Sequence, residues 1–105
     1  MANFINSENV DSNGTSLMGS VEISYKQLVK IFGKETYGLS GDQKCECNWE
    51  LLFNDGTVAT IYDWKVNKKY CGKTEGISKS KNTDWHIGGN SPKAVELVKK
   101  ELGLV

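Results

Sequence analysis

The sequence contains no arginine, one proline, one histidine and three cysteines among its 105 residues. All 13 basic residues are therefore lysines, and 13 acidic residues balance them to a formal net charge of zero. Lysine offers a point charge instead of the planar fork with which arginine reads guanine. A neutral chain also lacks the basic excess of a histone-like protein. These absences argue against sequence-specific DNA binding and against a strongly acidic DNA mimic.

Long apolar runs are also missing. No run approaches the roughly 18 residues of a membrane-spanning helix. The first ten residues lack the basic and apolar regions of a signal peptide. We therefore expect no membrane association and a cytoplasmic location. The odd number of cysteines argues against a disulfide framework, and a chain of this length buries a core without a metal ion. We expect no cofactor and no metal.

The chain divides into two parts. Residues 1–20 are rich in Asn, Ser and Gly and show no apolar period. They are predicted to be a flexible N-terminal arm, part of which could form an edge strand. Residues 21–105 are predicted to form a single α+β domain.

Two helices are predicted in this domain. Ser24 and Gln27 have capping-box spacing, and apolar residues then recur at helical spacing over residues 25–32, up to Gly33. Near the C-terminus, Ser91 is expected to cap a second helix with Pro92 at its first position. Its predicted buried residues are Ala94, Val95, Val98 and Leu102.

Residues 45–53 alternate between apolar and polar side chains, which predicts a strand. Asp55-Gly56 is typical of a two-residue hairpin turn, after which residues 58–65 alternate again. Centring the turn on this dipeptide places Trp49 opposite Tyr62 and puts Val58, Thr60, Tyr62 and Trp64 on the core face. It also places Glu46 opposite Lys65.

A third strand is predicted over residues 84–87, with Trp85 and Ile87 on one face, and Gly88-Gly89 is expected to end it. The order of elements favours a small antiparallel sheet of three or four strands packed against an N-terminal and a C-terminal helix.

Two groups of residues give weak indications of a metal site or a catalytic site. Cys45, Cys47, Cys71 and His86 could form a zinc set, but zinc cysteines seldom alternate within a strand, so buried cysteines are favoured. His86 and Asp84 share a strand face and could serve a cysteine nucleophile. No local signature supports this, so we predict no catalytic residue and no metal ligand.

Binding is better supported than catalysis. Trp85, His86, Gly88 and Gly89 combine aromatic rings with a backbone that a ligand can approach closely. The alternative, which we favour for the rings, is that they form the core. A basic connection over residues 66–83 adds local positive charge. The candidate residues for binding a partner or ligand are Lys68, Lys69, Lys73, Trp85, His86, Gly88 and Gly89.

Residues 23–33, 55–65 and 85–89, followed by the Val-rich final helix, resemble small phage-encoded proteins of unknown function. The resemblance implies an anti-defence protein of the anti-CRISPR kind in the host-cell cytoplasm. We therefore expect a non-enzymatic inhibitor that binds a host defence protein, such as a CRISPR–Cas effector, stoichiometrically. The alternatives are a sponge that sequesters a nucleotide immune signal and a small cysteine- or metal-dependent enzyme. A homodimer remains open.

We predict that changing Lys68, Lys69 and Lys73 together to Glu leaves the fold intact, because exposed lysines contribute little to stability. Binding to the partner should weaken, more at low salt than at high salt. Circular dichroism and affinity measurements at two salt concentrations test this. Wild-type affinity in the folded triple variant would contradict the prediction.

Overall fold

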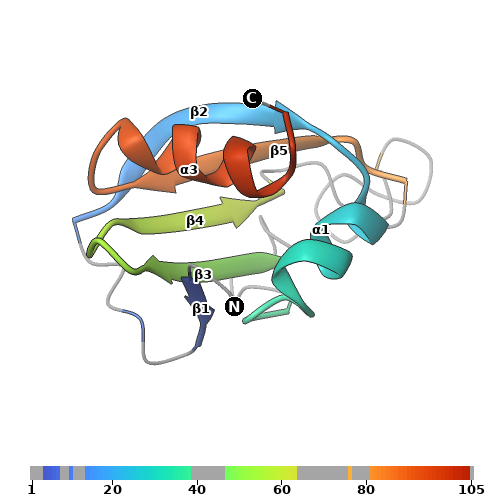
Figure 1. Cartoon of the computed structure of the whole chain (residues 1–105). Helices are drawn as coiled ribbons and strands as arrows, with labels where there is room; N and C mark the ends of the chain where they lie inside the picture. Colours follow the sequence, from blue (N-terminus) through green and yellow to red (C-terminus); the bar gives the residue numbers. More distant parts are fainter. Residues whose placement is uncertain are drawn as a thin grey trace.

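The computed structural model describes residues 4–7, 10, 14–38, 47–63, 76 and 81–104. Within these residues the chain forms two α-helices and five β-strands (Figure 1). In chain order the elements are β1 (Phe4–Asn6), β2 (Ser16–Glu22), α1 (Tyr25–Phe32), β3 (Asn48–Phe53), β4 (Val58–Tyr62), β5 (Asp84–Gly89) and α3 (Lys93–Glu101).

The five strands form one antiparallel sheet in the order β1-β3-β4-β5-β2. Both helices cover the same face of this sheet: α3 contacts β5, β2 and β4, and α1 packs near the start of β3 (Figure 1). The predicted α+β class is confirmed. The number of strands is higher than the three or four predicted, and two strands precede the first helix. Both extra strands lie at the edges of the sheet and come largely from residues 1–20, where the sequence has no apolar period.

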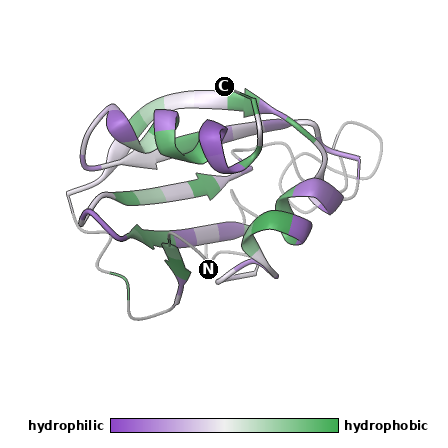
Figure 2. Cartoon of the chain, viewed as in Figure 1, coloured by the Kyte–Doolittle hydropathy of each residue, from purple (hydrophilic) through white to green (hydrophobic). Residues whose placement is uncertain are grey.

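Helix α1 begins and ends where the sequence predicts. The Ser24 hydroxyl accepts a hydrogen bond from the backbone N–H of Gln27 at 3.2 Å. Gly33 ends the helix with a φ of 85°, a conformation that costs glycine little. Leu28 and Phe32 are its buried residues. Hydrophobic and hydrophilic residues alternate along both helices, as amphipathic helices on a core require (Figure 2).

Helix α3 differs at its start. Pro92 already has helical dihedrals and occupies the cap position, and no side chain caps the helix there, so the predicted Ser91 cap is wrong. The carbonyl of Ser91 instead accepts from the backbone N–H of Ala94 at 3.1 Å. The predicted end at Gly103 is confirmed: Gly103 and Leu104 donate to the carbonyls of Lys100 and Lys99, which is a Schellman arrangement.

The β3–β4 hairpin forms, but the predicted register is wrong by one residue. The loop contains three residues, 54–56, instead of two. Phe53 donates to the carbonyl of Thr57 at 2.9 Å and accepts from Gly56 at 2.9 Å, and Gly56 has a φ of 90°. A type I turn followed by a glycine at positive φ is the usual three-residue hairpin loop. Trp49 therefore pairs with Ile61, and Tyr62 pairs with Asn48.

This shift exchanges the two faces of β4, because side chains alternate along a strand. Ala59 and Ile61 face the helices and are fully buried. Val58, Thr60 and Tyr62 belong to the opposite face instead of the predicted core face. The predicted positions of Cys47, Trp49, Leu51 and Phe53 in the core are confirmed. Glu46, Trp64 and Lys65 lie outside the described residues.

Strand β5 continues through Gly88 and Gly89, so the prediction that this dipeptide breaks the strand is wrong. Both glycines are needed for close packing. An added Cβ at Gly89 would lie 2.4 Å from Cβ of Ala94 in α3. One at Gly88 would lie 2.5 Å from Oγ1 of Thr60. The strand therefore runs on through both glycines, and the role of each glycine is to leave space that a side chain would occupy.

Two tryptophans form the centre of the core. Trp49 and Trp85 are fully buried, with ring centroids 5.4 Å apart in an edge-to-face arrangement. The indole N–H of Trp49 donates to the carbonyl of Gly33 at 2.8 Å, and that of Trp85 donates to the carbonyl of Ile23 at 3.0 Å. Ile23 precedes α1 and Gly33 follows it, so the two indoles hold the helix at both ends.

We predict that Trp49→Ala destabilises the protein by about 3–5 kcal/mol through the cavity that it leaves. That is a large part of the roughly 5–15 kcal/mol available to a domain. Chemical denaturation of wild type and variant measures the difference. A change below about 1 kcal/mol would contradict the buried position of this ring.

An ion pair joins the hairpin loop to the start of α3. The Asp55 carboxylate lies 2.5 Å from Nζ of Lys93, and it also accepts from the backbone N–H of Thr57 at 2.9 Å. The hydrogen bond from Lys93, and then that from Thr57, hold the pKa of Asp55 well below its usual value of 3.8. The same pair raises the pKa of Lys93.

Because the pKa of Asp55 is lower in the folded state, this pair stabilises the protein above the unfolded pKa, and the stabilisation is lost as the pH falls through the folded value. We expect Asp55→Asn to lower the melting temperature modestly at about pH 7 and less and less below about pH 4. Melting curves across this range test it, with the exposed Asp84→Asn as control. A difference that does not change with pH would contradict the ion pair.

Candidate functional site

The sheet face opposite the helices carries a group of polar side chains from the three central strands. Thr60 and Tyr62 stand there because the hairpin register directs them away from the core. Polar groups in the middle of a sheet are costly unless they have partners or a function. The register sets them side by side in four pairs: Asn48 with Tyr62, Glu50 with Thr60, Tyr62 with His86, and Thr60 with Gly88.

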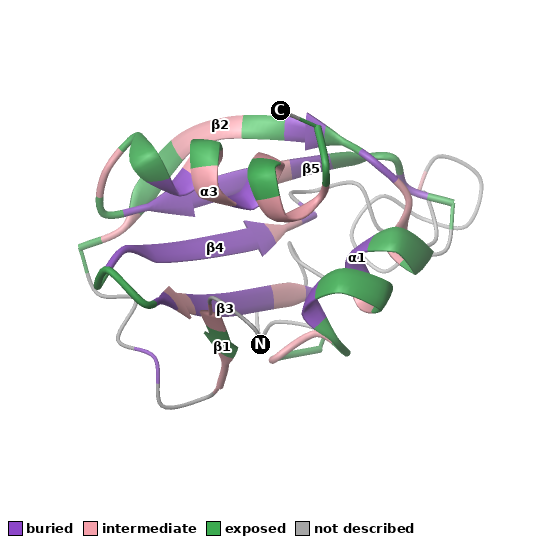
Figure 3. Ribbon diagram, in the orientation of Figure 1, coloured by how far each residue is buried: buried purple, intermediate pink, exposed green. Residues whose placement is uncertain are grey.

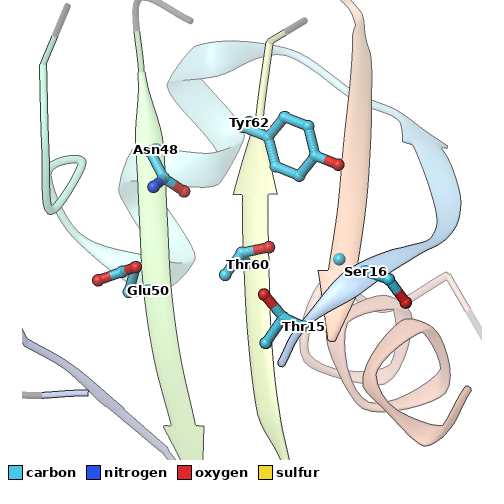
Figure 4. Close-up of a pocket in the computed structure, with 7 residues that line it drawn as sticks. Thr15, Ser16, Asn48, Glu50, Thr60 and Tyr62 are labelled. Carbon is cyan, nitrogen blue, oxygen red and sulfur yellow. The ribbon is translucent and has the colours of Figure 1, made fainter. Parts of the chain in front are cut away.

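A hollow of about 270 Å³ opens on this face, and Gly88 is one of the residues that line it. Figure 4 shows the side chains of its other lining residues. The missing side chain of Gly88 creates its floor, since a Cβ there would also lie 3.5 Å from the ring of Tyr62. We call it the strand hollow. Its lining residues are Thr15, Ser16, Asn48, Glu50, Thr60, Tyr62 and Gly88.

The strand hollow is lined mainly by hydrogen-bonding groups, and two of its polar residues are deeply buried. Glu50 is 7% exposed and Thr60 is 6% exposed. The side-chain oxygen of Asn48 is buried and has no hydrogen-bond partner among the described residues. Buried polar atoms normally have partners, so an unpaired one marks a place where a ligand can bind.

A second surface adjoins the strand hollow along β2, which forms one edge of the sheet. Ile23 donates to the carbonyl of Thr83 at 2.8 Å, so the alternation of an antiparallel pair turns the backbone groups of Ser20 and Glu22 away from β5. We call the surface formed by Leu17, Met18, Gly19, Ser20 and His86 the β2 edge; these residues line a second shallow hollow.

The β2 edge is accessible and carries little charge. Leu17 is 59% exposed, and Figure 3 shows exposed or intermediate residues along most of β2, whereas β4 is mostly buried. Glu22 is the only charged residue in the strand. A register shift between Leu17 and Gly19 marks a β-bulge. Bulges and charges are the usual protection of a free edge, and here the bulge is the main one.

The structure divides the residues that the sequence proposes for binding. His86 and Gly88 lie on the polar face, where the His86 ring meets that of Tyr62 edge-on with centroids 5.6 Å apart. Trp85 and Gly89 point to the opposite face and pack in the core, as the alternative interpretation of the rings expects. Lys68, Lys69 and Lys73 lie outside the described residues.

Cys47, the cysteine that the structure describes, lies on the opposite face of the sheet from His86. Cys47 is fully buried on the helix-covered face, where its thiol donates to the Glu35 carboxylate at 3.0 Å and its backbone N–H donates to Asp63 at 2.8 Å. His86 lies on the other face, so these two residues cannot form a nucleophile pair or share a metal ion. Within the described ranges, no group of three or more His, Cys, Asp or Glu side chains could hold a metal ion. Cys45 and Cys71 lie outside these ranges.

Sequence reasoning missed six of the seven described residues that line the strand hollow: Thr15, Ser16, Asn48, Glu50, Thr60 and Tyr62. The predicted two-residue turn directs Thr60 and Tyr62 into the core, and the alternation of β3 places Asn48 and Glu50 on the opposite face without indicating a role for them. A signal was present, because Asn54 before Asp55-Gly56 permits a three-residue loop that brings these four side chains to one face.

No protein-family model matches the chain, and no curated protein is significantly similar to it. In the part of the chain that the structure describes, no helix is long and apolar enough to cross a membrane. The strand hollow and the β2 edge are therefore the features that bear on function.

Proposed function

We propose that the chain is a non-enzymatic protein, phage-encoded as its resemblance implies, that inhibits a host antiviral defence component by stoichiometric binding. A CRISPR–Cas effector is the example that we favour, in the cytoplasm of the host cell. The observation that carries the binding function is the β2 edge, which lies on a seven-residue border strand of the sheet beside the strand hollow.

The mode of binding that fits this edge is strand addition. An extended segment of a partner pairs with the backbone of a free strand, and side-chain pockets on alternate positions give specificity. In β2 the backbone groups of Ser20 and Glu22 are directed outward to accept such a segment. The shallow hollow that the β2-edge residues form with His86, together with the exposed Leu17, provides contacts for the side chains of the partner segment.

The occupant is an extended partner segment with few acidic residues. Glu22 disfavours a carboxylate directly opposite, and Leu17 favours an apolar side chain. The same edge of a second copy of this chain is an alternative occupant, and the test below separates the two. No observation in the described residues favours the nucleotide sponge or the cysteine- or metal-dependent enzyme.

We predict that Ser20→Pro abolishes partner binding and leaves the sheet intact. Proline removes the outward N–H of residue 20, and edge strands tolerate proline where this group faces solvent. Ser20→Thr keeps the donor and serves as the matched control. Far-ultraviolet circular dichroism and the melting temperature establish that both variants fold.

The functional readout is the plating efficiency of a phage on bacteria with active CRISPR–Cas immunity. Wild type and Ser20→Thr should raise it and should co-purify with an effector subunit at a fixed ratio, whereas Ser20→Pro should do neither. Light scattering of the isolated chain identifies self-pairing. A chain that leaves immunity unchanged, or whose Ser20→Pro variant inhibits as well as wild type, would refute the proposal.

A further inference from the structure

The strand hollow has chemical features that the strand-addition mode does not explain. The described residues that line it supply one carboxylate, one side-chain amide, four hydroxyl groups and a glycine, and none of these described residues is cationic. We propose that the strand hollow binds a guanidinium group, presented by an arginine side chain of the partner protein. This inference rests on the proposed function only for the source of the group.

The side-chain oxygen of Asn48 is the first reason. It is buried and has no hydrogen-bond partner among the described residues. An acceptor that is buried without a partner costs free energy that a bound donor recovers. A molecule that enters the hollow therefore gains most if it brings an N–H or O–H group to Asn48.

The carboxylate of Glu50 is the second reason. It stands two residues along β3 from Asn48, hence on the same face, and the residue is 7% exposed. An ionised carboxylate only accepts hydrogen bonds, and bonds from a positively charged donor are the stronger ones. The same charge repels phosphate, so the lining selects a cation over a nucleotide.

The arrangement of the acceptors favours guanidinium over ammonium. The acceptors lie on β3 and β4, and neighbouring strands of a sheet are about 4.8 Å apart. Guanidinium presents five donors in a planar fork, whereas ammonium presents three from one point. The ring of Tyr62, placed against His86, adds an aromatic surface for a cation. Because the chain contains no arginine, the group must come from another molecule.

The test is a nuclear magnetic resonance titration of the full chain with the peptide acetyl-Gly-Arg-Gly-amide. We expect saturable shifts at the backbone amides around Asn48, Glu50, Thr60 and Gly88. The isosteric peptide with citrulline in place of arginine should bind at least about tenfold more weakly, because it lacks the charge. Spermidine serves as the free-polyamine probe and should also bind more weakly.

Variants localise the effect. Glu50→Gln should weaken binding of the arginine peptide about tenfold. Glu96→Gln makes the same change on the exposed surface of α3 and should leave the affinity unchanged. Tyr62→Phe removes only a hydroxyl group and should weaken binding severalfold, which provides a second test if Glu50→Gln impairs folding.

Equal affinity for the arginine and citrulline peptides, or no shifts around the hollow, would overturn the inference. Tighter binding of spermidine would overturn the choice of guanidinium and assign the site to free polyamines. Partner capture is measured separately with Ser20→Pro. If Ser20→Pro loses partner capture but the wild-type chain does not bind the arginine peptide, the proposed function stands and this inference is rejected. If the chain binds the arginine peptide but captures no partner, the proposed function is rejected and binding of guanidinium by the hollow stands.

Discussion

The register of the β3–β4 hairpin is the constraint on which the other features depend. Gly56 at a positive φ closes a three-residue loop, and this sets Trp49 opposite Ile61. Side chains alternate between faces, so a shift of one residue would turn Ile61 away from the helices and direct Thr60 and Tyr62 into the core. Burying these hydroxyl groups next to tryptophan would cost free energy without a hydrogen bond in return. The core and the polar face are thus two consequences of one loop.

The same register places the tryptophans so that they hold helix α1. Trp49 in β3 and Trp85 in β5 reach the chain just after and just before the helix through their indole N–H groups. Each bond pairs a buried indole N–H with a backbone carbonyl just outside α1. The indole donor therefore has a partner inside the core. The contact between sheet and helix therefore combines apolar packing with two directional bonds. This fixes one orientation of α1 and explains why the rings belong to the core.

Local patterns predict the parts of the fold that local interactions decide. The capping box of α1, the alternation of β3 and the central residues of β5 depend on neighbours within a few positions. Strand β1 has only three residues, and the apolar residues of β2 are interrupted by serine and glycine, so neither shows a clear alternation. Both pair with a strand that is distant in the sequence, which a local pattern does not reveal. The hairpin register depended on choosing between a two- and a three-residue loop, which the Asn54-Asp55-Gly56 sequence permits equally. For the site, His86 and Gly88 followed from residue type, whereas Glu50, Thr60 and Tyr62 required the correct register.

The dipeptide Gly88-Gly89 connects the packing of α3 with the strand hollow. Consecutive residues of a strand point to opposite faces, so two adjacent glycines remove side chains from both faces at one place. On one face Gly89 lets Ala94 approach, where an added Cβ would lie 2.4 Å away. On the other face Gly88 leaves the floor of the hollow bare. A side chain at residue 89 would push α3 from the sheet, whereas one at residue 88 would fill the hollow beside Thr60. Neighbouring glycines of identical chemistry therefore have different roles, one in stability and one in the proposed binding site.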